Sequence, residues 1–282
     1  MANIRDIKRR IQSIKNTKQI TNAMKMVATA KLRRSKERIF NARPYANQVA
    51  QILYNIKSHN QTLEMPVFDK VENPQKPLLI VVTSDRGLCG SFNHNIIKES
   101  IKSVYQNKNL DLICIGKKGY DYLKRRTDRI IQKYIGVFNQ MNFDISKEIG
   151  EYIYDLFMNQ GYDSIEIIYN EFVSVIQQNI IHKKIFPIET SEENKNLIDY
   201  IYEPDEATVI DEVIRKYVKI ELWRVMLESS AAEQGARMTA MDSATDNATE
   251  LIGELTLHYN RARQASITKE IIEISSGAEA IK

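Results

Sequence analysis

The 282-residue sequence predicts an α/β fold in which a Rossmann-like domain of about five strands is inserted between two terminal helices, which form a long antiparallel two-helix coiled coil. Three observations predict it. The end segments nearly lack helix breakers: residues 1–65 hold one proline and no glycine, and no proline follows Pro204. Their apolar residues recur at alternating steps of three and four. Between them, short β-branched runs alternate with helical patterns, which is typical of a parallel sheet with crossover helices.

Shifts in composition predict where these parts begin and end. We expect five parts: an N-terminal helix over 1–58, a linker over 59–77, an α/β domain over 78–188, a second linker over 189–206 and a C-terminal helix over 207–282. The stretch 188–206 is rich in Glu, Asn and Asp, which favours a mobile connection.

The N-terminal segment has coiled-coil spacing at both of its ends. The apolar positions are Ile4, Ile7, Ile11 and Ile14, and later Ile39, Ala42, Ala46, Val49, Leu53 and Ile56. The positions between them predict the same spacing after a shift of register: Ile20, Met24, Val27 and Leu32. Pro44 is expected to bend this helix rather than end it, because the apolar pattern resumes after it.

The C-terminal segment repeats the spacing with smaller side chains. Its predicted seam is Met241, Ala244, Ala248, Leu251, Leu255, His258, Ala262 and Ala265. Alanines also recur every four residues from Ala236 to Ala248, which lets a second helix approach closely. Because a compact domain separates the two helices in sequence, the simplest packing is an antiparallel pair.

The middle of the chain reads as alternating strands and helices. We expect strands over 78–83, 110–115, 130–137 and 165–169, with an added edge strand over 180–186. The helical patterns lie between them at about 91–106, 117–126 and 144–160. This order predicts a parallel sheet with right-handed crossovers.

The formal charge is unevenly distributed. Residues 1–58 carry 14 Lys/Arg against two Asp/Glu, a net of +12, whereas residues 59–203 and 204–282 carry −3 and −5. Within 229–282 the net charge is only −3, which cannot neutralise the basic helix. Most of the positive charge must therefore face an acidic surface on another molecule: nucleic acid, anionic lipid or a carboxylate-rich protein.

The sequence does not match the nucleotide-binding motifs at the position where an α/β domain would have them. The loop over 84–93, after the first expected strand, has Gly-x-x-Gly and matches neither the Rossmann fingerprint nor a P-loop. The alternative is a tight turn in which Asp85 and Arg86 pair or dock a partner. The four histidines are far apart: His59, His94, His182 and His258. We therefore expect no catalytic, cofactor-binding or metal site.

Cysteine usage and hydropathy indicate the compartment. Cys89 and Cys114 form neither a disulfide framework nor a metal-ligand spacing, as is usual in a reducing compartment. No apolar run approaches the roughly 18 residues that a spanning helix needs, and the N-terminus lacks an apolar signal core. Any membrane association is therefore expected to be peripheral.

Four motifs resemble the gamma-subunit family of bacterial F-type ATP synthases, and the resemblance covers essentially the whole length of the chain. They are Ile4-Arg-Asp-Ile-Lys-Arg-Arg-Ile, Asn16-Thr-Lys-Gln-Ile-Thr-Asn-Ala-Met-Lys-Met-Val-Ala, Ser84-Asp-Arg-Gly-Leu-Cys-Gly and, from Ile267, Ile-Thr-x-Glu-x-x-Glu-x-x-x-Gly-Ala. The last is the family's signature.

The resemblance implies a non-catalytic rotor shaft, one copy per complex. In the family the paired helices turn inside a hexamer of alpha and beta subunits, and the α/β domain lies near the epsilon subunit and the membrane c-ring. Ion-driven rotation takes the three catalytic sites on the beta subunits through binding, synthesis and release of ATP. This implies a peripheral protein on the cytoplasmic face of the bacterial plasma membrane, with no nucleic-acid partner and no cofactor.

The resemblance also implies which residues contact partners. Met24 and Lys25 match the family position that meets an acidic lever loop of the beta subunit. Arg263 and Gln264 match the pair that hydrogen-bonds a catch loop of beta, where a guanidinium fork suits carboxylates.

Two further regions are implied to touch partners. Arg86 is a candidate for a similar charged contact. The C-terminal tip from Ile271 onward, including Ile274, resembles the part that turns in an apolar sleeve.

Two rival interpretations stay open from the sequence. A basic coiled-coil protein that binds nucleic acid would explain the charged N-terminus, but its basic segment has few interleaved aromatics: Phe40, Tyr45 and Tyr54. An enzyme that uses the α/β domain would bind a nucleotide and melt at a higher temperature in its presence.

Overall fold

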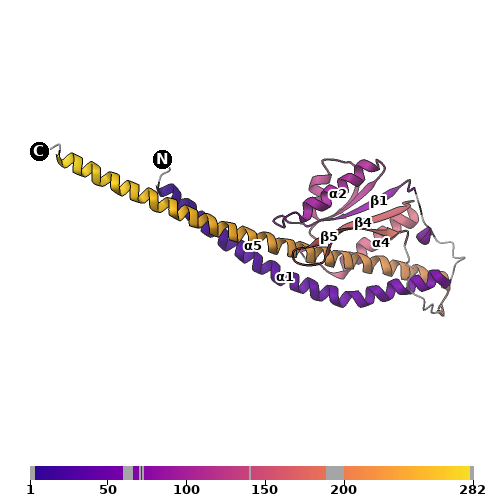
Figure 1. Ribbon diagram of the computed structural model, residues 1–282. Helices are drawn as coiled ribbons and strands as arrows, with labels where there is room; N and C mark the ends of the chain where they lie inside the picture. The colour runs from indigo at the N-terminus through magenta and orange to yellow at the C-terminus, as the bar shows by residue number, and fades with distance from the viewer. Residues whose placement is uncertain are drawn as a thin grey trace. The chain divides into compact units, whose positions relative to one another are not determined.

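The computed structural model describes residues 4–59, 66–69, 71, 73–139, 141–188 and 200–279 (Figure 1). The chain forms two compact units. One is helical and comes from both ends of the chain, up to residue 28 and from residue 238 onward; the other is an α/β unit over 29–237. Two long helices, α1 (Ile4–His59) and α5 (Glu206–Glu279), supply residues to both units. Most of the connection expected over 188–206 lies outside the described residues.

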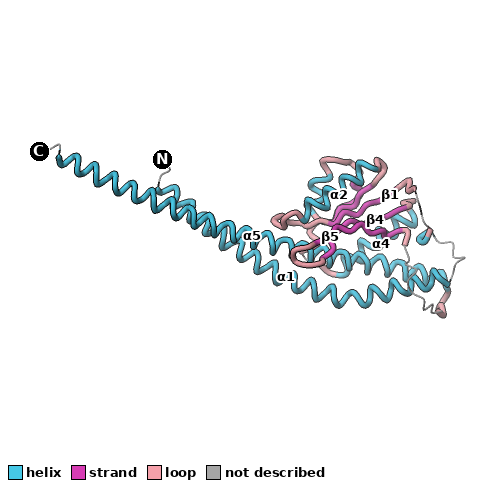
Figure 2. The backbone as a smooth tube through the Cα atoms, viewed as in Figure 1, coloured by secondary structure: helices cyan, strands magenta, loops and turns pink. Residues whose placement is uncertain are grey.

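A five-stranded sheet forms the centre of the α/β unit (Figure 2). Its strands in chain order are β1 (Pro77–Val82), β2 (Asp111–Ile115), β3 (Ile130–Tyr134), β4 (Ser164–Phe172) and β5 (Gln178–Phe186). They are arranged β3-β2-β1-β4-β5, with β1 to β4 parallel and the edge strand β5 antiparallel to β4. All five predicted strands are confirmed, with ends that differ by at most three residues.

The helices of this unit lie where the crossovers require them. They are α2 (Phe92–Gln106), α3 (Lys117–Leu123) and α4 (Phe143–Asn159), with a short 3-10 turn at Pro66–Phe68. The helix α3 ends three residues before the predicted end, because the backbone tightens there and the N–H of Arg126 donates to the carbonyl of Leu123. In Figure 1, α2 covers one face of the sheet and α4 the other.

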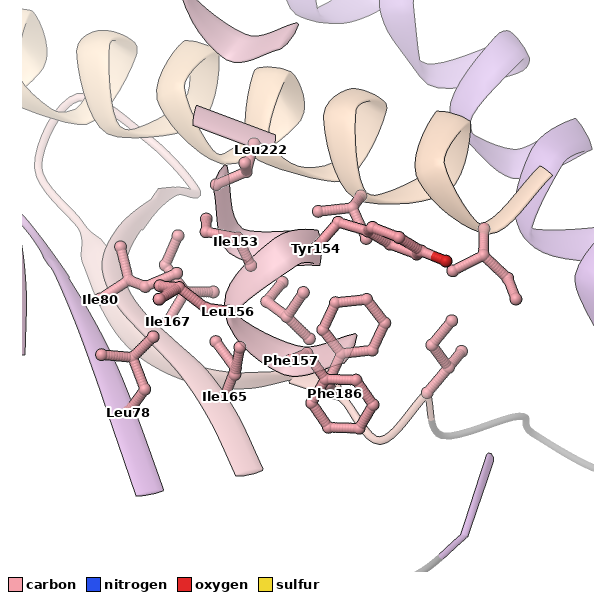
Figure 3. Close-up of a cluster of buried hydrophobic side chains, with 14 of the residues drawn as sticks. Leu78, Ile80, Ile153, Tyr154, Leu156, Phe157, Ile165, Ile167, Phe186 and Leu222 are labelled. Atoms are coloured by element: carbon pink, nitrogen blue, oxygen red, sulfur yellow. The ribbon is translucent and has the colours of Figure 1, made fainter. Parts of the chain in front are cut away.

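Both faces of the central strand β1 are buried, which explains why β1 is apolar along its whole length. On one face, side chains of β1 and β4 pack against α4 and against Leu222 of α5 (Figure 3). On the other face, Leu79 and Val81 of β1 pack against Ile96 of α2. The continuous apolar run of a central strand therefore has a partner layer on each side.

The buried face of α1 keeps one register, so the predicted register shift is wrong. Buried and half-buried positions recur at uninterrupted steps of three and four: 7, 11, 14, 18, 21, 25, 28, 32, 35, 39, 42, 46, 49, 53 and 56. Polar residues hold some of these positions; Thr21 Oγ1 lies 2.8 Å from Thr245 Oγ1 of α5. Ile20 and Val27 are instead 60% and 56% exposed. The helix continues through Pro44, as expected.

The seam of α5 in the helical unit differs from the predicted one beyond Ala248. Ile252 and Tyr259 are half-buried there, whereas Leu251 and His258 are exposed. The seam therefore moves by one residue at every second position, while the predicted positions 255 and 262 between them stay half-buried. A physical reason is that the ring of Tyr259 offers more apolar surface than the imidazole of His258.

Candidate partner-binding surfaces

Lys25 lies at the edge of the helix pair in the helical unit. Its ammonium forms an ion pair with Asp242 of α5, and both side chains stay partly exposed. This pair and the Thr21–Thr245 contact show that α1 and α5 run antiparallel here, because the α1 number rises as the α5 number falls. An ion pair open to water contributes little to stability. The ammonium keeps access to a carboxylate from outside the chain.

A small apolar stripe lies beside Lys25 on α1. Met24 is half-buried, and Ile20 and Val27 are exposed at the four- and three-residue spacings that place side chains on one helix face. Met26 is also exposed. This end of α1 therefore offers apolar side chains next to a cation, a surface suited to a protein partner that is both apolar and acidic.

Arg263 and Gln264 are both exposed on α5. In the part of the chain that the structure describes, neither side chain has a hydrogen-bond or ion-pair partner; the carbonyl of Gln264 accepts from Thr268. A guanidinium without a partner retains its donors for a planar carboxylate or amide. The structure thus leaves this predicted contact pair available.

The C-terminal tip exposes large apolar side chains, most of them on one helix face. Ile271 and Ile274 are 60% and 73% exposed, and Ile267 and Ile272 are exposed as well. At about 100° per residue, Ile267, Ile271 and Ile274 lie on one helix face and Ile272 lies on another. Exposed apolar side chains of this kind are normally covered by a partner.

The loop Ser84–Gly90 follows β1, and Asp85 joins it to the rest of the α/β unit. The Asp85 carboxylate accepts backbone N–H groups from Lys117 at 3.1 Å, from Gly136 at 2.9 Å and from Phe138 at 3.4 Å. Arg86 is exposed and, among the residues described, has no ion-pair partner. The alternative in which Asp85 and Arg86 pair is therefore wrong.

The crevice in which an open α/β sheet commonly binds its ligand is filled by α5. Cys89 and Phe92, beyond the end of β1, pack against Ala232 and Ala236 of α5. Phe172, at the end of β4, completes this contact; a Cβ on Gly235 would lie only 3.2 Å from its ring. The chain's own helix therefore takes the place that the nucleotide interpretation needs.

A buried ionic cluster joins β5 to α5 in the α/β unit, and sequence reasoning missed it. Glu221 Oε1 accepts from Lys183 at 2.5 Å and from Arg224 at 2.6 Å. Burial raises the pKa of Glu221, but the two cations outweigh it and the net pKa is lowered. Burial lowers the pKa of Lys183. The only signal in the sequence is that charged residues recur between the large apolar residues of this helical stretch.

Glu228 lies about two turns further along α5 than Glu221, and its carboxylate has fewer partners. Its Oε1 is 4.0 Å from Arg224, and its Oε2 is buried without a hydrogen-bond partner in the described structure. Burial raises the pKa of this carboxyl, against the opposing effect of Arg224. Nothing in the sequence separates it from the well-paired Glu221.

The described part of the chain holds no group of three or more His, Cys, Asp or Glu side chains placed to bind a metal ion. None of its helices is both long and apolar enough to cross a membrane.

Comparisons with known proteins cover the full chain. Residues 3–281 match a family model described as ATP synthase. The chain is 44% identical to the ATP synthase gamma chain of Salinibacter ruber, covering 100% of this chain and 99% of that one. It is also 44% identical to that of Chlorobium limicola, covering all of both chains.

Solved structures show the same likeness. A chain in the central stalk and c-ring structure of the Tetrahymena thermophila mitochondrial ATP synthase is 27% identical, with a TM-score of 0.66 over 80% of this chain and 99% of that one. A chain of the Euglena gracilis mitochondrial ATP synthase, 21% identical, has a TM-score of 0.73 over 99% and 94%. The second comparison shows the shared fold alone.

Proposed function

The chain belongs to the ATP synthase gamma-chain family, and from this premise we propose that it is the central rotor shaft of an F-type ATP synthase, without a catalytic group of its own. The observation that carries this function is the full-length match to gamma chains at 44% identity. The antiparallel helix pair and the inserted α/β unit agree with it.

Such a shaft acts through differential contact. Ion flow through the membrane ring turns the chain, so each beta subunit meets a different side of the helix pair in turn. Each orientation stabilises a different conformation of a catalytic site, and the difference in contact free energy couples rotation to ATP synthesis or hydrolysis. For this role the chain needs exposed side chains that differ from one side of the helix pair to another. It needs no reactive group.

The surface around Lys25 supports a contact with an acidic loop of the beta subunit. The Lys25 side chain is 37% exposed, so a carboxylate of a partner can approach its ammonium beside Asp242. The apolar side chains of Met24, Ile20 and Val27 would add contact area. This gives a protein partner to part of the basic charge of the N-terminal segment.

Arg263 and Gln264 would bind the catch loop of the beta subunit, because both are exposed and uncommitted. The tip that contains Ile271 and Ile274 would turn in an apolar sleeve formed by the alpha and beta subunits. Its exposed apolar side chains would contact the wall of that sleeve as the shaft turns.

The α/β unit would supply the contacts to the epsilon subunit and the c-ring, and Arg86 is a candidate for a further charged contact. One chain serves each complex. Attachment to the ring makes the chain peripheral on the cytoplasmic face of the bacterial plasma membrane. No finding supports the nucleic-acid alternative, which would show duplex binding that weakens steeply with salt.

Reconstitution with the matching alpha and beta subunits tests this function. The double variant Arg263→Ala, Gln264→Ala is compared with wild type and with Arg261→Ala, which changes an exposed arginine two residues before Arg263. We expect a stable complex whose ATP hydrolysis falls roughly tenfold or more in the double variant, since it loses charge-assisted hydrogen bonds. The Arg261 control should keep its activity. Failure of the wild-type chain to assemble would contradict the proposal.

A further inference from the structure

Two buried charged residues of α5 face the loop Ser84–Gly90. Arg237 and Glu233 are 8% and 5% exposed. Arg237 Nη2 lies 2.7 Å from Glu233 Oε1 and 3.1 Å from the carbonyl oxygen of Gly87, to which it donates a hydrogen bond. One guanidinium nitrogen therefore links the helix to the backbone of the loop. A buried charge pair is costly to keep unless its geometry is well satisfied.

The same loop is held from inside the α/β unit. Asn93 Nδ2 donates to Ser84 Oγ at 2.8 Å, and Asn93 Oδ1 accepts from the backbone N–H of Ser84 at 2.9 Å. Ser84 Oγ in turn donates to the carbonyl of Arg86 at 2.5 Å. These bonds fix the beginning of the loop and leave its middle, at Gly87, to the contact with Arg237.

The backbone of the loop needs such support. Leu88 has a φ of 61°, in the left-handed region that is unfavourable for a residue with a branched side chain. Strained conformations of this kind persist only where the surrounding structure holds them. Leu88 itself is 64% exposed, so its own side chain supplies little of the packing that holds it.

We propose that Arg237 and Glu233 are positioning residues that hold the loop Ser84–Gly90 against α5 and thereby fix where Arg86 is presented to a protein partner. Both residues are buried, so they act through the loop and not by touching the partner. The identity of that partner rests on the proposed function; the link between Arg237 and the loop does not.

The two native cysteines report on this link. Cys89, in the loop, is 2% exposed and packs on Ala232 and Ala236 beside Arg237. Burial raises the pKa of its thiol. Cys114, inside the sheet, is fully buried, and burial raises its pKa to about 12. Release of the loop should expose Cys89 alone, whereas unfolding of the α/β unit should expose both.

The test is the rate of maleimide labelling of each cysteine in the full-length chain, assigned by peptide mass spectrometry. In Arg237→Ala we expect Cys89 to label about ten to a hundred times faster, from the loss of hydrogen bonds to a charged group, while Cys114 stays at its wild-type rate. Arg237→Lys keeps the charge but not the planar fork, so it should give an intermediate rate. Arg261→Ala, on the same helix, should change neither.

A Cys89 rate within about twofold of wild type in folded Arg237→Ala would overturn the proposal. If both cysteines react faster together, that variant has unfolded and Glu233→Gln decides: faster labelling of Cys89 alone supports the link, and an unchanged rate rejects it. Failure of the wild-type chain to assemble with the alpha and beta subunits would count against the proposed function only, since labelling of the free chain does not depend on assembly.

Discussion

The buried charges of α5 differ in how well the surrounding residues satisfy them. Glu221 has two cationic partners within 2.6 Å, whereas Glu228 has one arginine at 4.0 Å and an oxygen without a partner in the described structure. Removing a well-paired carboxylate leaves cations buried without a counter-charge; removing a poorly paired one does not. The two glutamates should therefore respond in opposite ways to the same substitution.

Glu221→Gln is expected to lower the free energy of unfolding by about 3 kcal/mol at pH 7, because Lys183 and Arg224 lose their buried counter-charge. Urea unfolding followed by circular dichroism measures the change. Glu254→Gln, an exposed glutamate of the same helix, is the matched control and should stay within about 0.5 kcal/mol of wild type. A loss no larger than in the control would show that the cluster is not held by charge.

Glu228→Gln is expected to stabilise the protein at pH 8 and to have less effect near pH 4.5. The pKa of Glu228 is raised above its ordinary value of 4.5, so the folded protein favours the neutral form and loses stability as pH rises through the folded pKa. A neutral glutamine removes that loss. Urea midpoints of wild type and variant at the two pH values measure it. A variant that is less stable than wild type at pH 8 would contradict the assignment.

At this scale the sequence allows part of the candidate site to be predicted. Met24, Lys25, Arg263 and Gln264 follow from motif resemblance, and the structure leaves all four at least partly accessible. The link from Arg237 to the loop could not be predicted, because the residues are 150 positions apart and the acceptor is a backbone carbonyl. Every residue has a backbone carbonyl, so the residue type of the acceptor does not reveal such a hydrogen bond.

At the scale of elements, glycines decide where two helices approach closely. A Cβ on Gly150 of α4 would lie 2.8 Å from Lys219 Cγ and 3.1 Å from Lys219 Cα on α5. Gly253 of α5, in contrast, has no atom within 4 Å of that position. Both glycines lie in helices, but only Gly150 has close neighbours. Alanine substitutions at the two positions therefore separate the effect of helix propensity from the effect of packing.

Gly150→Ala is expected to destabilise the α/β unit by about 1–3 kcal/mol, because the added methyl group pushes against the α5 backbone by more than alanine's helix propensity recovers. Gly253→Ala should instead stabilise by up to about 1 kcal/mol. Thermal unfolding of both variants measures these changes. Equal changes in stability of the same sign would mean that the close approach of α4 and α5 does not affect the free energy of unfolding.

The elements themselves are the most predictable level of the fold. Strands and helices of the α/β unit follow from runs of β-branched residues and helical spacing, and each is found within three residues of its expected ends. The seam of α1 is less predictable, because Thr21 holds a buried position while Ile20 and Val27 are exposed. Hydrophobic spacing assigns a face only where polar seam contacts, such as Thr21 with Thr245, are few.

At the scale of the whole molecule, the charge distribution suits a chain that works inside a protein complex. The +12 of residues 1–58 is only partly paired within the helical unit, where Lys25 pairs with Asp242. Exposed apolar side chains at Ile20, Val27 and the C-terminal tip give the same indication, because such groups are normally covered by a partner. Rotation inside the alpha and beta subunits is the central claim that follows.

Direct observation of rotation tests that claim. Tyr105 of α2 is 71% exposed, so the variant Tyr105→Cys offers an accessible thiol to which a bead can be attached. The native Cys89 and Cys114 are buried and should react far less. With alpha and beta subunits fixed to a surface, the account predicts that ATP turns the bead in one direction, in steps set by the three catalytic sites. ATP hydrolysis by the assembled complex without rotation of the bead would contradict it.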